Sequence, residues 1–590
     1  MKPMKLIQAR LCLAAAGLVL CQLPLRAVDF HVATAQDLQN ALTLAAANGA
    51  DDNIYLTNGY YVGNFNFNST EARNITLLPE PGLTNTGITI DGAGTGRSMN
   101  LSCSADANLT VRGLTFLRNC GSASNAGLRV GTGGGGTVLV DGCRFISPTN
   151  TSCMGLEIVS GLNATVVGCT AAGAVVPFIV NSVANGISVS GLTGTLTVQN
   201  CTVTTNIGSG LSVASGSIVA ITGNTFSGNS STSYSGGSGV TCSGTTVTIS
   251  GNTFIGNSTT FFAGGGAYCS GTTVTISNNN FTGNSGYSFG GASCSGTTIM
   301  LSGNTFTGNS ASGYYYSDPA GSGGGASCSG TTITLSGNTF TGNSATGNGG
   351  GTSCSGTTVT LSGNTFTGNS AATSYGGTSC GGGTSCYGYT GSTMTLTNNT
   401  FIGNSAGSGI GGGAYCKTDY GNSTIILSGN TARLNTAGSG GGLYLVSSTV
   451  SLLDNLVINN AQSSSSSKGG GVWVNAYTNL DMINNTVFGN TAQGNGGGVA
   501  FQVDSVTEIL NVFNNIIWGN TASGNGADVH LAGTGQSKTF RFNDAHDMYG
   551  VWDIAVNNLD VSPQFFDPVN GDYHIQSTSP CKDTGTNGAP

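Results

Sequence analysis

The sequence predicts an all-β protein: a single-stranded, right-handed parallel β-helix of roughly 15 coils with a helical cap at its N-terminal end. Three observations predict it. A repeat of 25 to 35 residues runs through most of the 590-residue chain, a period typical of solenoids. The chain contains 98 glycines and only 7% charged residues. Short alternating strands follow one another with no helical segment between them, which excludes βαβ architectures.

The composition excludes two other classes of glycine-rich protein. The glycines have no strict three-residue period and only 11 prolines are present, so the chain is not a collagen. Hydrophobic residues make up 38% of the chain, which is too many for a segment kept disordered by its charge. The remaining class is an all-β protein with glycine-rich turns.

The first 27 residues have the pattern of a signal peptide. Lys2, Lys5 and Arg10 precede the apolar run from Leu11 to Leu20, and cleavage is expected near Ala27. The run is too short for a membrane span, so we expect an extracellular or cell-surface protein, associated with the outer membrane. The mature chain then keeps 12 Lys and Arg against 24 Asp and Glu, a balance that disfavours nucleic-acid binding.

The mature chain begins with a cap and the first coils, assigned to residues 28–100. Thr34 to Asp37 have the pattern of a helix start, and Leu38, Ala41, Leu42 and Ala45 follow at helical spacing. We expect an amphipathic helix over residues 34–47 that covers the first coil, because an open solenoid end exposes unpaired strand edges. Asp37 is interpreted as a helix cap and not as a catalytic acid.

The repeats occupy residues 101–527 and centre on the phrase Gly-Asn-Thr-Phe-x-Gly-Asn-Ser. Its phenylalanines predict a stacked column in the dry interior, and its second asparagines predict a ladder in which each amide bonds the coils above and below. The phenylalanines are Phe226, Phe254, Phe281, Phe306, Phe340, Phe366 and Phe401. The asparagines are Asn229, Asn257, Asn284, Asn309, Asn343, Asn369 and Asn404.

Alternation within one repeat predicts which side chains face inward. Cys269 and Val274 fall on the inner face with Ile276, while Thr273 and Thr275 fall on the outer face. Glycine and asparagine occupy the corners, where a positive φ is cheap for them. Outward threonine pairs of this kind would form a double row: Thr246/Thr248, Thr273/Thr275, Thr332/Thr334, Thr358/Thr360 and Thr393/Thr395.

Fifteen cysteines remain after processing, and ten of them occupy repeated positions. We favour stacked free thiols in the core, with disulfides between neighbouring coils as the alternative. Cys380 and Cys386, in a glycine-rich insertion, are a candidate local disulfide. One of these two belongs to a column with Cys242, Cys269, Cys294, Cys328, Cys354 and Cys416. In three other coils a cysteine replaces the first repeat asparagine, at Cys143, Cys169 and Cys201. No C-x-x-C pair occurs, so no zinc site is expected.

The repeat fades over residues 528–590, where His, Asp, Trp and Pro return. We expect a cap of irregular strands that includes a hairpin turn at Asn570-Gly571.

The repeat signals resemble those of the chlamydial polymorphic outer membrane proteins. Gly265-Gly266-Ala267 with Phe254-Ile255-Gly256-Asn257 shows the two signals. The whole mature chain resembles bacterial right-handed β-helix proteins of the choice-of-anchor Q type, both in the opening from Ala35 to Gly63 and in the closing phrases from Pro563 to His574 and Ser579 to Asn587. The resemblance implies a secreted or surface-displayed β-helix with a variable C-terminal anchor. No anchor precedes Pro590, so truncation before one is an expectation.

Many β-helices of this outline are polysaccharide lyases or hydrolases, but the middle coils lack the groups for such chemistry. Between Glu157 and Lys417 the only charged residue is Asp318, and histidine is absent. Hydrolysis needs two carboxylates about 5–10 Å apart, and a calcium site needs several carboxylate oxygens. The middle of the rod therefore supplies neither, and no cofactor is expected.

Two clusters outside the middle coils are weak catalytic candidates, with solvated surface charge as the alternative for both. Asp141 could converge with Arg112 and Arg118 on the early coils. Near the C-terminus, Asp544, His546 and Asp547 could bind a cation or shuttle a proton.

We therefore favour a non-catalytic, monomeric rod for adhesion, display or glycan binding, whose partners are glycans or a host or neighbouring cell surface. The insertion Ser312 to Ser322, with three tyrosines, would present aromatic side chains to them. The first alternative is a polysaccharide lyase or glycoside hydrolase with its site on the terminal coils. The second is an ice-binding solenoid that uses the threonine rows.

Overall fold

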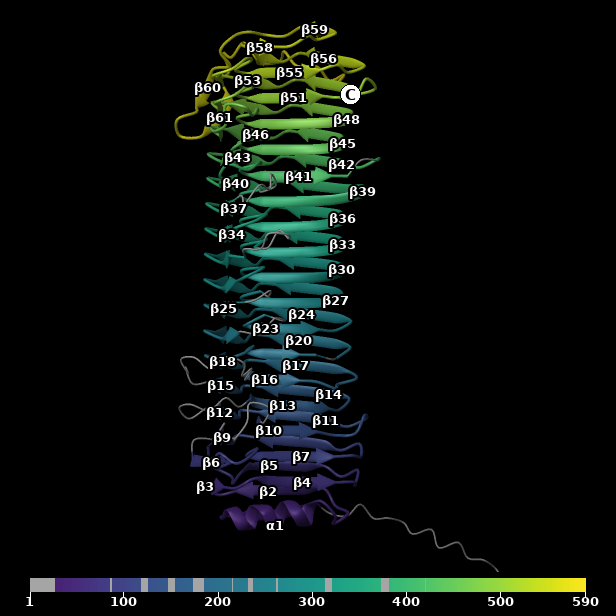
Figure 1. Cartoon of the computed structure of the whole chain (residues 1–590), viewed down its shortest axis with the longest axis vertical. Coiled ribbons are helices and arrows are strands. Elements are labelled where there is room, and N and C mark those ends of the chain that lie inside the picture. Colours follow the sequence, from purple (N-terminus) through teal and green to yellow (C-terminus); the bar gives the residue numbers. More distant parts are fainter. Residues whose placement is uncertain are drawn as a thin grey trace, which may run out of the picture.

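The chain forms one elongated parallel β-solenoid of about 17 turns (Figure 1). The computed structural model describes residues 27–589 apart from 85–86, 118–125, 147–153, 173–184, 215, 232–236, 261–263, 314–320, 373–380 and 420. The predicted signal peptide, the three tyrosines of the insertion, Arg118 and Cys380 thus lie outside the described residues. The turns exceed the roughly 15 predicted because the first coils, from β1 (Val28–Val32) and β2 (Asp52–Leu56) onward, lack the repeat phrase.

One repeat illustrates the coil. β27 (Ala267–Ser277) runs along two faces, β28 (Asn280–Thr282) forms the third, and β29 (Ser285–Gly286) is a short fourth segment. The chain turns between β27 and β28 at Asn278, with φ 55°, and between β28 and β29 at Gly283, with φ 61°. Asparagine and glycine are the residues that accept this left-handed conformation most readily, which explains why they recur at the corners.

Successive coils pair in parallel and in register. β27 pairs with β30 (Ala292–Ser302), which places Cys269 beside Cys294 and Thr273 beside Thr298. Because repeated residues then have a like neighbour about 4.8 Å away, columns form as predicted. The rings of the phenylalanine column are fully buried and stack with centroids 4.5 Å apart at Phe254 and Phe281 and 5.2 Å apart at Phe226 and Phe254.

The predicted asparagine ladder is present. Asn284 Nδ2 donates to Asn309 Oδ1 at 3.0 Å, and Asn309 Nδ2 donates to Asn343 Oδ1 at 2.9 Å. The ladder ends at the buried Asp528, whose Oδ1 accepts from Asn520 Nδ2. A second ladder, which we did not predict, joins the first asparagines of the repeats. It includes Asn224, Asn252, Asn279, Asn304, Asn338, Asn364, Asn399, Asn430, Asn455, Asn485, Asn515 and Asn543.

A helix covers the N-terminal end of the rod, and a C-terminal hairpin packs against its flank (Figure 1). Helix α1 (Ala35–Ala45) buries Leu38, Ala41, Leu42 and Ala45, and Thr34 Oγ1 accepts from the backbone N of Asp37 at 3.1 Å. The predicted cap and the role of Asp37 in it are confirmed. β60 (Phe565–Asp567) and β61 (Asp572–Ile575) pair antiparallel around the predicted turn. No helix in the described part of the chain is long and apolar enough to cross a membrane.

No disulfide joins any two of the described cysteines, in line with the stacked free thiols favoured from the sequence. Cys242 Sγ lies 3.4 Å from Cys269 Sγ, and Cys386 fills the column position between Cys354 and Cys416. The disulfide between Cys380 and Cys386 stays a prediction, because Cys380 lies outside the described residues.

We expect the buried thiols to resist modification in the folded protein. The hydrogen bond with Cys242 and burial raise the pKa of Cys269, whereas the hydrogen bonds with Cys354 and Cys416 lower the pKa of Cys386. Burial shields every thiol of the column from a reagent, whatever its pKa. Labelling with an aromatic disulfide reagent, followed by peptide mass analysis, should modify the column only after denaturation. Rapid native labelling of Cys269, or a mass 2 Da lower per pair from oxidation, would contradict this expectation.

Candidate functional site

The charged residues proposed on the early coils form a surface ion pair. Asp141 at the end of β11 (Thr137–Asp141) lies opposite Arg112 at the end of β8 (Asn108–Arg112), and Arg112 Nε is 3.5 Å from Asp141 Oδ2. Both side chains are about half exposed. A pair of this kind contributes little energy because water screens it. Arg118, the third proposed member, is not among the described residues.

The side chains of the three C-terminal candidates have separate hydrogen-bond partners, although the backbone N–H groups of His546 and Asp547 both donate to Asp528 Oδ2. Asp544 is buried, which raises its pKa, and its oxygens accept from Val561 N and from Cys581 Sγ at 3.2 Å. His546 is exposed, and its Nδ1 lies 2.7 Å from Asp560 Oδ1, a contact that raises the pKa of the imidazole. Asp547 Oδ2 accepts from the backbone of Ala527 at 3.0 Å. No group of three or more potential metal ligands occurs among the described residues.

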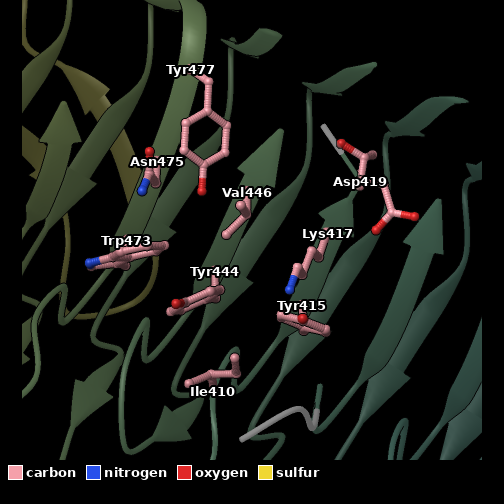
Figure 2. Close-up of a pocket in the computed structure, with 10 residues that line it drawn as sticks. Ile410, Tyr415, Lys417, Asp419, Tyr444, Val446, Trp473, Asn475 and Tyr477 are labelled. Atoms are coloured by element: carbon pink, nitrogen blue, oxygen red, sulfur yellow. The ribbon is translucent and has the colours of Figure 1, made fainter. Parts of the chain in front are cut away.

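A cavity of about 260 Å³ lies instead on the outer face of three neighbouring coils (Figure 2). The strands that form it are β41 (Ala414–Thr418), β45 (Leu443–Leu453) and β48 (Val472–Ile483), whose first residues pair in register. We name this cavity the aromatic pocket. Its lining residues are Ile410, Tyr415, Lys417, Thr418, Asp419, Tyr444, Val446, Trp473, Asn475 and Tyr477.

Three aromatic rings form a row along the rod axis in this pocket. Tyr415, Tyr444 and Trp473 occupy the same outward position on the three strands. The Tyr444 and Trp473 rings stack with centroids 4.1 Å apart and planes 14° apart, and Tyr415 is tilted at 43° to Tyr444. Since the stacked faces cover each other, the row offers mainly ring edges and polar groups to a ligand. Burial raises the pKa of Tyr444, so its hydroxyl stays protonated.

The polar groups of the aromatic pocket lie in the next outward column. Lys417, Val446 and Asn475 share one register position, and Tyr387 on β39 (Thr384–Thr397) precedes them. The Tyr387 hydroxyl donates to Asp419, which raises the pKa of Tyr387 to about 12 and holds the carboxylate in place. Lys417 is exposed. No acidic group of the described residues lies within salt-bridge distance of its ammonium.

Asn475 is the unusual member of this set. Its side chain is only 6% exposed, and its Oδ1 accepts no hydrogen bond from any described residue. Its Nδ2 donates to Asp504 Oδ2 at 2.8 Å. Buried polar atoms are nearly always paired, because an unpaired one costs about 1–3 kcal/mol. This oxygen therefore indicates a place for a ligand donor.

The sequence contained a signal for this pocket that we did not use. An aromatic residue stands two positions after Gly-Gly-Gly in three successive repeats, at Tyr415, Tyr444 and Trp473, spaced 29 residues apart. The four repeats before these have serine there, at Ser293, Ser327, Ser353 and Ser385, and Tyr268 is an isolated aromatic residue at the same position further back. An equal spacing of aromatics in a solenoid predicts a row on one face.

A second cavity, of about 380 Å³, lies where the C-terminal hairpin meets the rod. Its lining includes Arg433, Leu434, Ile458, Val569 and Tyr573. The described residues show no unpaired buried polar atom in this lining. The second cavity therefore offers a weaker indication of a ligand than the aromatic pocket does.

The threonine pairs do form two outward columns. Thr246, Thr273 and Thr332 stand in one, with Thr298 between the last two. In the other column Met300 replaces threonine and is 40% exposed. The array is thus regular but interrupted.

A family model agrees with this fold. The model of the right handed beta helix region family matches residues 100–281. A mannuronic acid specific polysaccharide family 6 lyase enzyme from human gut microbiota is 13% identical, over 92% of this chain and 89% of that chain, with a TM-score of 0.19. The PL6 family alginate lyase AlyGC is 12% identical, over 91% of this chain and 98% of that chain, with a TM-score of 0.21. No curated protein matches the sequence.

Together, the in-register coils and the family match define a right-handed parallel β-helix repeat protein.

Proposed function

We propose that this protein is a secreted or cell-surface glycan-binding rod that works without catalysis and binds its ligand in the aromatic pocket. The observation that carries the proposal is the buried oxygen of Asn475, which no described residue pairs, beside the aromatic row and the exposed ammonium of Lys417. Sugar hydroxyls both donate and accept hydrogen bonds, and small-molecule sites combine such polar groups with aromatic walls.

The charges of the pocket favour binding over hydrolysis. Asp419 is the one carboxylate among the described lining residues, and Tyr387 already holds it. A glycosidase needs two carboxylates across the scissile bond. An uronate lyase needs a base and a group that neutralises the carboxylate of the substrate. If the protein degrades a glycan and Lys417→Met abolishes this activity, the lyase alternative is favoured instead.

Replacing Trp473 by alanine is expected to weaken glycan binding at least tenfold. The change removes the largest ring of the row and the partner of Tyr444 at 4.1 Å, so that the pocket loses both area and shape. A glycan array followed by titration of the strongest ligands measures the effect. Trp518→Ala is the matched control, since Trp518 is also partly exposed but lies on β53 (Ile516–Trp518), in a different sheet.

The glycan proposal fails if the array yields no ligand, or if the two tryptophan variants bind equally. Lyase and hydrolase assays on the same glycans should show no product. Product formation lost in Asp141→Ala or Asp544→Ala would assign catalysis to the terminal coils instead.

Ice binding by the threonine rows is the second candidate, supported by their register on the outer face. Ice recrystallisation inhibition by the protein, lost in Thr334→Lys, would favour it. Unchanged ice growth would leave the rows as ordinary outward β-strand residues.

A further inference from the structure

We propose that the aromatic pocket selects an N-acetylated amino sugar by gripping its acetamido group between Asn475 and Lys417. The inference rests on the proposed glycan binding and specifies the substrate class of that site. Three features carry it: the fixed orientation of Asn475, the column that it shares with Lys417, and the apolar side chain between them.

The orientation of the Asn475 amide is fixed by its neighbour. Nδ2 donates to Asp504 Oδ2, and the other oxygen of that carboxylate accepts from Gln502 Nε2 at 2.6 Å. Rotating the amide by half a turn would set its oxygen against a carboxylate, which repels it. Asn475 therefore offers the pocket an acceptor and requires a donor from the ligand.

Lys417, two coils away from Asn475, requires the opposite kind of group from the ligand. Lys417, Val446 and Asn475 follow one another in register on β41, β45 and β48, so Lys417 and Asn475 are separated by about 9.6 Å at two strand spacings. An ammonium only donates, so Lys417 requires an acceptor from the ligand. The column thus presents, in order, a donor, an apolar side chain and an acceptor.

A secondary amide matches this order. Its N–H and C=O point in opposite directions, so that N–H can meet Asn475 Oδ1 while C=O meets Lys417 Nζ. The acetyl methyl then packs against Val446. A hydroxyl group in place of the acetamido group is too short to bond Asn475 Oδ1 and Lys417 Nζ at once. The sugar ring would rest along the edges of Tyr444 and Trp473, which occupy the neighbouring column.

The test uses three oligosaccharides that differ at one position. Tetramers of β-1,4-linked N-acetylglucosamine, glucose and glucosamine carry an acetamido, a hydroxyl and an ammonium group there. Calorimetric titration of the full-length mature protein should show the acetylated tetramer binding at least tenfold tighter than the other two. Asn475→Leu and Lys417→Met should each reduce this preference to about twofold or less.

Asn479→Leu is the matched control, because Asn479 lies on the same strand β48 and donates to Asp481, outside the pocket. It should keep the full preference. If Asn475→Leu fails to fold by circular dichroism, Lys417→Met decides, since Lys417 is exposed.

The outcomes separate this inference from the proposed function. Equal binding of the acetylated and glucose tetramers would overturn the acetamido inference and leave glycan binding standing. Tighter binding of the glucosamine tetramer would also overturn it and would point to Asp419 instead. An N-acetylated dipeptide that binds as tightly as the acetylated sugar would overturn it in favour of peptide recognition. Binding of no carbohydrate at all would end both proposals.

Discussion

Replacing Asn309 by leucine is expected to destabilise the central coils by roughly 3–6 kcal/mol, because the ladder leaves several buried groups unpaired when one member is removed. Asn309 Nδ2 donates to Asn343 Oδ1 and to the Phe281 carbonyl, both at 2.9 Å. Its Oδ1 accepts from the backbone N and from Nδ2 of Asn284, both at 3.0 Å. Leucine satisfies none of these groups.

Urea unfolding, followed by far-ultraviolet circular dichroism, measures the loss of stability. Hydrogen exchange of the Asn284 backbone amide measures the same loss locally. Hydrogen exchange matters here because a solenoid can unfold locally, coil by coil. Asn280→Leu is the control: Asn280 is exposed on the adjacent coil, where its Oδ1 accepts from Thr282. Equal stability of the two variants would mean that the ladder contributes no net energy.

Replacing Glu508 by glutamine is expected to stabilise the protein, and more strongly as the pH rises. Glu508 lies between β51 (Val499–Val503) and β52 (Ile509–Phe513) with its side chain fully buried. Neither carboxyl oxygen has a hydrogen-bond partner among the described residues. Burial raises its pKa from 4.5 to about 8, because the charged form is costly away from water.

The sign of the pH dependence follows from the raised pKa. Below about pH 4.5 the carboxyl is protonated in both the folded and the unfolded chain, so that its ionisation costs the folded state no stability. As the pH rises toward 8, the unfolded chain loses its proton more easily than the folded one, so the folded state loses stability. One pKa unit corresponds to about 1.4 kcal/mol, so the loss across this window approaches roughly 4 kcal/mol.

Glutamine keeps the shape of the side chain and removes the ionisation. Melting temperatures measured from pH 4 to pH 9 should coincide for the native protein and Glu508→Gln at the acid end and diverge toward the alkaline end. Asp29→Asn removes one charge from an exposed position and serves as the control. A constant difference across the pH range would show that the Glu508 carboxyl is already solvated in the folded protein.

The coil, the columns and the capping helix could be predicted because they depend on local patterns that repeat. A strand of alternating residues buries alternate side chains wherever it lies, and Asn278 or Gly283 turns the chain in each coil for the same local reason. Given a period near 28 residues, like residues must stack. The second ladder was accessible in the same way, since Asn279 recurs in each repeat as regularly as Asn284 does.

The aromatic pocket could be predicted less well, because it depends on contacts between repeats. Tyr415, Tyr444 and Trp473 are each separated by 29 residues, and their meeting requires that three coils keep the same register. The orientation of the Asn475 amide is set by Asp504, on the following coil, which accepts from its nitrogen and leaves the oxygen without a partner among the described residues. No pattern within one repeat indicates this.

The solenoid, its glycine and asparagine corners and the buried columns follow from the repeat, because each copy imposes the same inward and outward alternation. Which outward residues act together, and which acids are buried, depends on how the coils stack in the folded chain. Charged and aromatic side chains at irregular positions acquire their surroundings from the neighbouring coils. Lys417, Val446 and Asn475, which we assign to ligand binding, therefore lie together only because their coils stack.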